Sequence, residues 1–113
     1  MRLSANQKAI LITLYAIAER QGAFKPVPVM VLFRAVNSER EACGEKSIAD
    51  RNFRISCHTL ARNGLLQKLR NTQSLQLLFT LSEQGAAAAR PLYETFLAKQ
   101  GVKDGDSVSR EDD

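Results

Sequence analysis

The sequence predicts a mainly α-helical domain with one small β-hairpin, in the order helix, short strand, helix, helix, hairpin, helix. Apolar residues recur at helical spacing through the first half of the chain and again near its end. Two short leucine-rich runs, 65–70 and 74–81, flank the polar tripeptide 71–73, a pattern that is typical of a hairpin. With 113 residues, 44% of them hydrophobic, the chain is long enough for one domain with a modest core.

The first helix is expected to begin at a capping box and to end at a glycine. Ser4 and Gln7 have the Ser-x-x-Gln spacing that caps helix starts, and Gly22 follows the last apolar turn. Between them, apolar side chains cover more than one side of the helix: Ile10, Leu14 and Ile17 in one stripe, and Leu11, Tyr15 and Ala18 beside it. So wide an apolar surface favours a second subunit packed against this helix.

Two further helices are expected before Gly64. A brief extended segment containing Pro26 leads into the second helix, whose first turn suits Pro28. Its apolar side chains repeat at helical spacing, and a turn follows at 43–45. The third helix is expected at about 47–63, with Ser47 or Asp50 as its N-cap. The link at 37–46 is long, so either the second helix is extended or a loop projects there.

The third helix has two distinct faces. Its apolar face consists of Phe53, Ser56, Cys57 and Leu60, which fit a compact core. The opposite face carries Arg51, Arg54, His58 and Arg62 within about one third of the circumference. The helix is therefore expected to pack on the body and to present long hydrogen-bond donors outward.

The last helix is expected to follow a cap at Ser82, and Pro91 either kinks it or starts another helix. Beyond Pro91 an apolar stripe remains after the hairpin domain is complete. It either packs on a two-fold mate or folds back on the chain's own first helix. We expect the dimer, with an interface formed by Leu11, Tyr15, Tyr93, Phe96 and Leu97.

Residues 1–100 are thus predicted to form the domain with its dimerisation segment, and residues 101–113 a disordered acidic tail open to a protein partner. The tail has two basic and five acidic residues, a net charge of −3 within a chain of net charge +4. Residues 46–73 have six basic residues against Asp50, a net charge of +5. Positive charge concentrated in one quarter of the chain is typical of proteins that bind a polyanion.

Catalytic, metal and membrane functions find no support in the sequence. Cys43 and Cys57 match no zinc-binding spacing and His58 is the only histidine, so we expect reduced thiols and neither a metal nor a cofactor. There is no nucleophile–base pair or phosphate-binding loop, so the protein is not expected to be an enzyme. The apolar run 9–18 is too short to cross a bilayer, and the start lacks a signal-peptide pattern. A cytoplasmic protein without membrane contact is expected.

Two segments carry a family resemblance. Leu60-Ala61-Arg62-Asn63-Gly64-Leu65 and Leu81-Ser82-Glu83-Gln84-Gly85 resemble the winged helix-turn-helix of MarR-type and PadR-type bacterial regulators. In those families the recognition helix ends in Leu-x-x-x-Gly-Leu, and the second strand of the wing runs into Leu-Thr/Ser-Glu-x-Gly. The resemblance covers about residues 47–90. It implies an α-β-α-α-β-β-α winged helix-turn-helix, with the recognition helix at about 47–63 and the wing at 66–81.

The resemblance and the chemistry of the residues together indicate a DNA interface. The major groove admits one helix, and a basic wing reaches the neighbouring backbone or minor groove. Asn52 suits adenine and either arginine before His58 suits guanine. Ile55 meets a thymine methyl or packs on the second helix, and His58 is a DNA contact or a plain surface residue. The expected DNA-binding residues are Lys46, Ser47, Arg51, Asn52, Arg54, Ile55, His58, Arg62, Lys68, Arg70, Asn71 and Gln73.

The expected function is sequence-specific binding of double-stranded DNA by a homodimer whose two recognition helices enter successive major grooves. Such a protein would be a bacterial transcriptional regulator or a DNA-binding adaptor of a plasmid or mobile element. The alternative is a winged helix that contacts only other proteins. The basic face of the third helix argues against that alternative.

Overall fold

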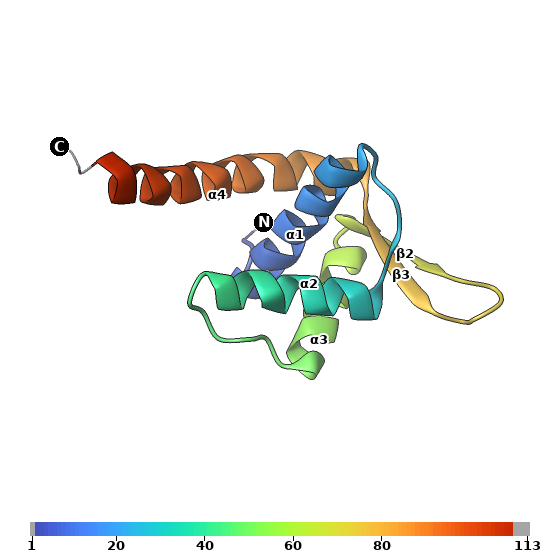
Figure 1. The fold of residues 1–113 in the computed structure, drawn as a ribbon. Coiled ribbons are helices and arrows are strands. Elements are labelled where there is room, and N and C mark those ends of the chain that lie inside the picture. The colour runs from blue at the N-terminus through green and yellow to red at the C-terminus, as the bar shows by residue number, and fades with distance from the viewer. Residues whose placement is uncertain (1, 110–113) are drawn as a thin grey trace.

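The computed structural model describes the backbone of residues 2–109 and the side chains of residues 2–100. Its elements occur in the predicted order: α1 (Ala5–Gln21), β1 (Val27–Pro28), α2 (Val29–Ala42), α3 (Asp50–Arg62), β2 (Leu66–Arg70), β3 (Leu77–Leu81) and α4 (Glu83–Ser109). Figure 1 shows α2 and α3 below α1, the β2–β3 hairpin projecting to one side, and α4 crossing above α1. The α3 helix therefore lies on the side of the body away from α4, whereas β3 leads directly into the start of α4.

The predicted caps of α1 are confirmed. The Ser4 hydroxyl accepts a hydrogen bond from the Gln7 backbone N–H at 3.1 Å, and the Gln7 side-chain oxygen accepts one from the Ser4 N–H at 2.8 Å. Gly22, with φ 76°, ends the helix in the left-handed region. Both ends of α1 are thus fixed by the residues that the sequence indicated.

The wide apolar surface of α1 is covered within the chain. Ile10 and Leu11 are fully buried in one core that α1 shares with α2, α3 and the sheet, and α4 packs along another side of α1. The expectation that Leu11 lies at a dimer interface is therefore wrong. A helix surrounded by three others needs apolar residues on several sides even in a monomer.

The α2 helix is long and includes residues 37–42 of the predicted link 37–46. It begins directly after Pro28, which stands one position earlier than expected, and continues to Ala42. The Asn37 side chain then holds the extended segment before α3: its amide nitrogen donates to the Ile48 carbonyl at 3.1 Å, and its oxygen accepts from the Ile48 N–H at 2.7 Å. Ile48 itself is buried.

The α3 helix begins at Asp50, later than the predicted start near residue 47, and neither predicted N-cap residue caps it. Ala49 occupies the cap position without a side-chain hydrogen bond. The Ser47 hydroxyl donates instead to the Glu41 carboxylate at 2.6 Å, and Asp50 is the first helical residue. The Asn37 clamp on Ile48 explains the difference, because it keeps the chain extended up to Ala49.

The sheet is antiparallel in the order β1-β3-β2. Val27 pairs with Phe79, Leu66 with Leu81 and Arg70 with Leu77. The strand β3 begins at Leu77 rather than at the predicted Ser74. Residues 71–76 form a wider loop, in which the Asn71 side-chain oxygen accepts hydrogen bonds from the backbone N–H groups of residues 73 and 74.

The α4 helix is continuous from Glu83 to Ser109, with Pro91 inside it, so Pro91 does not start a separate helix. Its backbone stays helical beyond Gln100, which differs from the disordered tail predicted from residue 101 onward. No proline follows Pro91, and each glycine in a helix costs only about 1 kcal/mol relative to alanine. Residues 110–113 of the predicted tail lie outside the described part, and its binding to a protein partner stays a prediction. Within residues 2–109 no helix is long and apolar enough to cross a membrane.

Candidate nucleic-acid interface

The wing is fixed to α3 by a joint built from the two resemblance segments. The Ser82 hydroxyl donates to the Gly64 carbonyl at 2.6 Å and accepts from the Gly85 N–H at 3.0 Å, while the Ser82 N–H donates to the Leu65 carbonyl at 3.1 Å. A Cβ at Gly85 would stand 1.8 Å from that Leu65 oxygen. Only glycine allows α4 to start this close to the beginning of β2.

The two predicted faces of α3 are confirmed. Phe53, Ser56, Cys57 and Leu60 are buried. On the other side Arg51, Asn52 and Arg62 are exposed, and Arg54 and His58 are half-buried. Ile55 is 52% exposed, so it does not serve as a core contact and remains accessible on the outer face. The helix thus presents donors and one apolar side chain outward.

The outer face of α3 meets the wing at His58. The Lys68 ammonium on β2 lies 3.5 Å from the His58 Nδ1, and the His58 ring stands edge-on to Phe79 with centroids 5.8 Å apart. An open hollow of about 430 Å³ separates the helix end from the strand, lined by His58, Ala61, Arg62, Leu66 and Lys68. Helix and wing thus form one continuous surface.

Basic side chains surround His58 on this surface. Burial of the ring lowers the pKa of His58, and the charges of Lys68, Arg54 and Arg62 lower it further. His58 is therefore neutral at neutral pH, and its Nδ1 accepts the hydrogen bond from Lys68. The three cations repel a further positive charge at His58, and the same arrangement attracts an anion.

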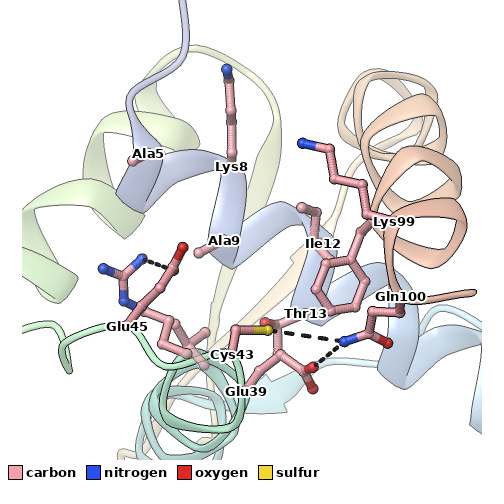
Figure 2. A pocket seen from close by; sticks show the side chains of 13 residues that line it. Ala5, Lys8, Ala9, Ile12, Thr13, Glu39, Cys43, Glu45, Lys99 and Gln100 are labelled. Atoms are coloured by element: carbon pink, nitrogen blue, oxygen red, sulfur yellow. Dashed lines mark hydrogen bonds and ion pairs between the residues drawn. The ribbon is translucent and has the colours of Figure 1, made fainter. Parts of the chain in front are cut away.

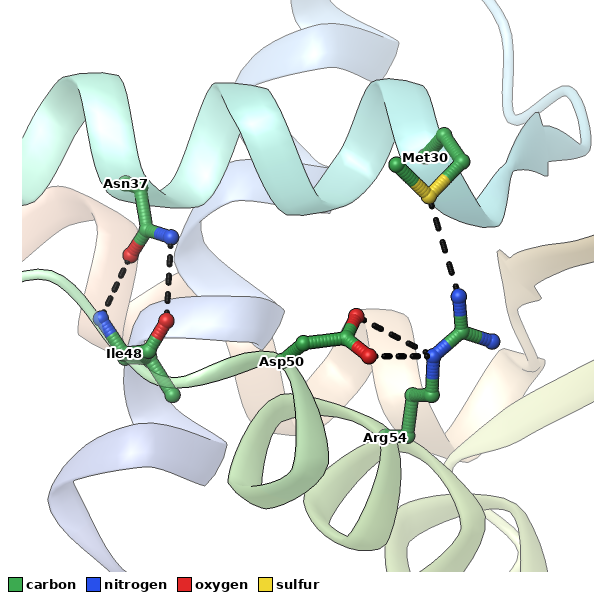
Figure 3. A network of polar contacts seen from close by, with 5 residues as sticks. All are labelled: Met30, Asn37, Ile48, Asp50 and Arg54. Carbon is green, nitrogen blue, oxygen red and sulfur yellow. Dashed lines mark hydrogen bonds and ion pairs between the residues drawn. The ribbon is translucent and has the colours of Figure 1, made fainter.

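Arg54 is held between two elements, as Figure 3 shows. Its Nε donates to both carboxylate oxygens of Asp50, each at 3.1 Å, and its Nη2 lies 3.7 Å from the Met30 sulfur on α2. Arg54 thus lies at the junction of α2 and α3, where the sequence placed a DNA contact. Sequence reasoning missed Met30, because nothing along the chain indicates that it stands beside residue 54.

The chain is similar to known proteins in its fold but not detectably in its sequence. No protein-family description and no curated protein matches the sequence. Among solved structures, the chain is similar to SSV1 F-93, with a TM-score of 0.67 and 15% identity over 90% of this chain and 97% of that chain. The similarity extends over nearly the whole of both chains. It agrees with the element order described above, in which a β-hairpin follows α3. The fold is a winged helix-turn-helix. In it, α3 is the helix that precedes the wing, and β2–β3 form the wing.

The predicted residues of the winged helix-turn-helix do not all have free side chains. In the wing, the Arg70 Nη1 donates to the Leu75 carbonyl at 2.7 Å, and Asn71 is engaged in the loop turn, whereas Lys68 and Gln73 are exposed. Lys46 and Ser47 precede the recognition helix, and the Ser47 hydroxyl is bonded to Glu41.

The tip of the wing also carries a residue that the sequence did not single out. Leu75, with φ 59°, is 65% exposed there. Its left-handed backbone belongs to the turn of the loop. The prediction missed this because it placed residue 75 inside a longer β3. Arg70, Asn71 and Leu75 thus shape the tip, where Gln73 is exposed, whereas Lys68 is exposed in the middle of β2, opposite Phe79.

The predicted dimer residues beyond Leu11 lie where α4 folds back on α1 of the same chain. The rings of Tyr15 and Tyr93 are 5.1 Å apart, and Phe24 stands edge-on to Tyr15 at 5.9 Å. Of the two arrangements left open by the sequence, the packing of α4 on its own α1 is therefore the one present for this pair. Leu97 remains 45% exposed.

A cavity of about 410 Å³ lies among α1, α2 and α4 (Figure 2). Phe96 lines it, and the Gln100 amide closes one side by donating to the Glu39 carboxylate at 3.5 Å and approaching the Cys43 sulfur at 3.9 Å. The ion pair of Arg40 and Glu45, 3.3 Å long, borders another side. Within the part of the chain described here, no group of three or more His, Cys, Asp or Glu residues could hold a metal ion.

Proposed function

We propose that the protein binds double-stranded DNA, with the recognition helix α3 in the major groove and the wing on the adjacent backbone or minor groove. The observation that carries this proposal is the surface shared by α3 and β2, where basic side chains of both elements stand together and Lys68 Nζ lies 3.5 Å from His58 Nδ1. A helix with one buried face and one face of long donors has the form that groove binding requires.

The side chains divide into two roles. Arg51, Asn52 and Arg54, in the first half of α3, suit base edges, and the exposed Ile55 suits a thymine methyl. Arg62 and Lys68 lie at the far end of the helix and on the wing, where they suit phosphates. Lys46 and Gln73 extend this phosphate-contacting set at the two edges, with Ser47, Arg70 and Asn71 supporting them through the contacts described above.

We further propose that the protein acts as a homodimer in the cytoplasm of a bacterium, as a transcriptional regulator or as a DNA-binding adaptor of a plasmid or mobile element, and that its role is binding rather than catalysis. The likeness of its two sequence segments to MarR-type and PadR-type regulators supports the assignment. The projecting α4, with Leu97 exposed, supports a two-fold partner.

Fluorescence anisotropy with labelled duplex DNA tests the proposal. Binding should weaken steeply with salt, and log K should fall by about 0.9 per log unit of salt for each phosphate contacted. Lys68→Ala should reduce this slope by about 1 for every sequence, whereas Arg51→Ala should lose mainly sequence discrimination. Arg90→Ala on α4, distant from α3 in the fold, serves as the control and should leave binding unchanged.

Two results would contradict the proposal. If the protein binds no duplex at low salt, DNA is not its partner, and a winged helix that contacts only proteins becomes the better interpretation. If Arg90→Ala weakens binding as much as Lys68→Ala, the surface of α3 and β2 is not the interface.

A further inference from the structure

We propose that Asp50 is a positioning residue that presents the end of the Arg54 guanidinium to a guanine, so that the pair forms one specificity-determining unit. This inference rests on the DNA-binding function proposed above. It starts from the contact in Figure 3, in which both carboxylate oxygens of Asp50 accept from the Arg54 Nε at 3.1 Å.

The contact with Asp50 leaves the Nη end of the Arg54 guanidinium directed away from the carboxylate and available to a base. Because Nε is engaged by Asp50 and Nη2 has one weak contact, with the Met30 sulfur, further N–H groups on Nη1 and Nη2 remain to form a fork at the end of the guanidinium. A fork of two parallel donors matches the O6 and N7 acceptors of guanine, which is the commonest specific contact of arginine in the major groove. The Met30 sulfur, a weak acceptor, lies 3.7 Å from Nη2 and limits the sweep of the side chain from the α2 side.

The base of this unit is itself fixed. Asp50 is the first residue of α3, and the two hydrogen bonds between Asn37 and the Ile48 backbone hold the chain immediately before it. The buried Ile48 side chain anchors the same segment. The carboxylate therefore stands on a rigid support, as a group that orients another side chain must.

The charge of Asp50 suits the first turn of α3, but it is exceptional among the charges of this surface. It is the only acidic residue between 46 and 73, against six basic residues, and it is exposed. A carboxylate near phosphates lowers the affinity for every DNA sequence. A carboxylate that restricts Arg54 to one orientation raises the discrimination between sequences, because a preordered donor pair loses less entropy on binding guanine. Asp50 thus exchanges general affinity for selectivity.

The test uses the full chain and a library of duplexes with a randomised centre, sequenced before and after selection. The wild type should enrich guanine at one position of each half-site. Arg54→Lys, which keeps the charge but not the fork, should reduce that preference by about 5-fold or more. Asp50→Asn should reduce it by up to about 5-fold, as expected for loss of an exposed ion pair, and should strengthen binding to random duplex. The double variant should show no further loss of preference beyond Arg54→Lys.

Glu94→Gln is the matched control. It removes the acid from an exposed pair of the same spacing on α4, where Arg90 Nε lies 3.3 Å from Glu94. It should change neither the guanine preference nor the affinity. Circular dichroism of each variant establishes that the helices are retained, and Asp50→Glu, which keeps the charge, provides a second variant that should keep part of the preference.

The outcomes separate this inference from the proposed function. If the wild type binds duplex DNA and Asp50→Asn keeps the full guanine preference, Asp50 does not position Arg54, although DNA binding stands. If Asp50→Asn weakens binding to all duplexes equally, Asp50 acts only through the stability of α3, and the inference is wrong. If the wild type binds no duplex, the proposed function itself fails.

Discussion

The Lys68 ammonium on the wing lies 3.5 Å from Nδ1 of His58 on α3, so the two parts of the candidate interface meet at a titratable group. An ammonium group only donates, so Nδ1 must accept, and the imidazole is neutral in this contact. Protonation of His58 would replace this hydrogen bond by repulsion from Lys68, Arg54 and Arg62. The contact between His58 of α3 and Lys68 of the wing is therefore sensitive to pH in the range where histidine titrates.

The first prediction concerns the stability of the free protein. The pKa of folded His58 is lowered from 6.5, so below that pH the unfolded state binds more protons than the folded state. The free energy of unfolding should thus have its full His58 contribution above about pH 6.5 and lose part of it as the pH falls further. Urea denaturation of the wild type and of His58→Gln between about pH 7.5 and 5.5 measures the difference.

His58 is the only histidine in the sequence, so its replacement removes the histidine titration completely. The difference in unfolding free energy between the wild type and His58→Gln should therefore change with pH in this range. A constant difference would contradict the lowered pKa.

The second prediction concerns binding. A DNA phosphate near His58 favours the imidazolium, so the pKa of His58 should rise in the complex and DNA binding should take up a proton. Affinity for duplex DNA should then increase as the pH falls from about 7.5 to 6, and His58→Gln should show a much weaker increase. Anisotropy titrations at constant salt provide the measurement. If the wild type and His58→Gln have the same pH dependence, His58 is a plain surface residue.

The sequence was sufficient for the elements that local chemistry determines. The capping box at Ser4, the left-handed Gly22, the two faces of α3 and the hairpin all follow from side-chain periodicity and turn residues. The segments at Gly64 and Gly85 bracket the wing in the sequence, and in the structure Gly85 lies close to the Leu65 backbone.

The errors have a common physical origin, which is contact between residues far apart in the chain. The start of α3 depends on Asn37 holding Ile48, eleven positions away. The assignment of Leu11 to an interface failed because Leu11 is buried in the core that α1 shares with α2, α3 and the sheet, while α4 covers another side of α1. In the same way, nothing local indicates that Met30 stands beside Arg54, 24 positions away. The i,i+4 spacing of Asp50 and Arg54 is a local signal that the sequence prediction did not use, and Arg70 is bound to Leu75 only because residues 71–76 form a loop instead of extending β3.

The third prediction tests the joint. Gly85→Ala places a methyl group against the backbone oxygen of Leu65, where no flexible side chain can move away. The substitution should destabilise the fold by about 1–3 kcal/mol or more, as overpacking does, and should weaken DNA binding by displacing the wing from α3. Thermal unfolding followed by circular dichroism measures the first effect. Gln84→Ala, at the exposed neighbouring position, is the control and should have little effect. Equal stability of Gly85→Ala and the wild type would mean that the joint is looser than its geometry indicates.

The fourth prediction concerns the two-fold partner, which now depends on α4 alone. Because Tyr93 packs on Tyr15 within the chain while Leu97 is 45% exposed, the two positions should respond differently to a charge. Tyr93→Glu should destabilise each subunit. Leu97→Glu should leave the subunit folded and dissociate the dimer. Size exclusion with light scattering should give twice the 12.5 kDa chain mass for the wild type and the chain mass itself for Leu97→Glu.

Leu97→Ala, which keeps the face uncharged, should remain largely dimeric. A dimer sets the spacing between recognition helices, so Leu97→Glu should also bind a two-half-site duplex more weakly than the wild type while binding a single half-site equally. A wild-type protein that is monomeric at tens of micromolar would exclude the two-fold arrangement and leave the proposed DNA surface intact, because none of the residues proposed for that surface lies on α4.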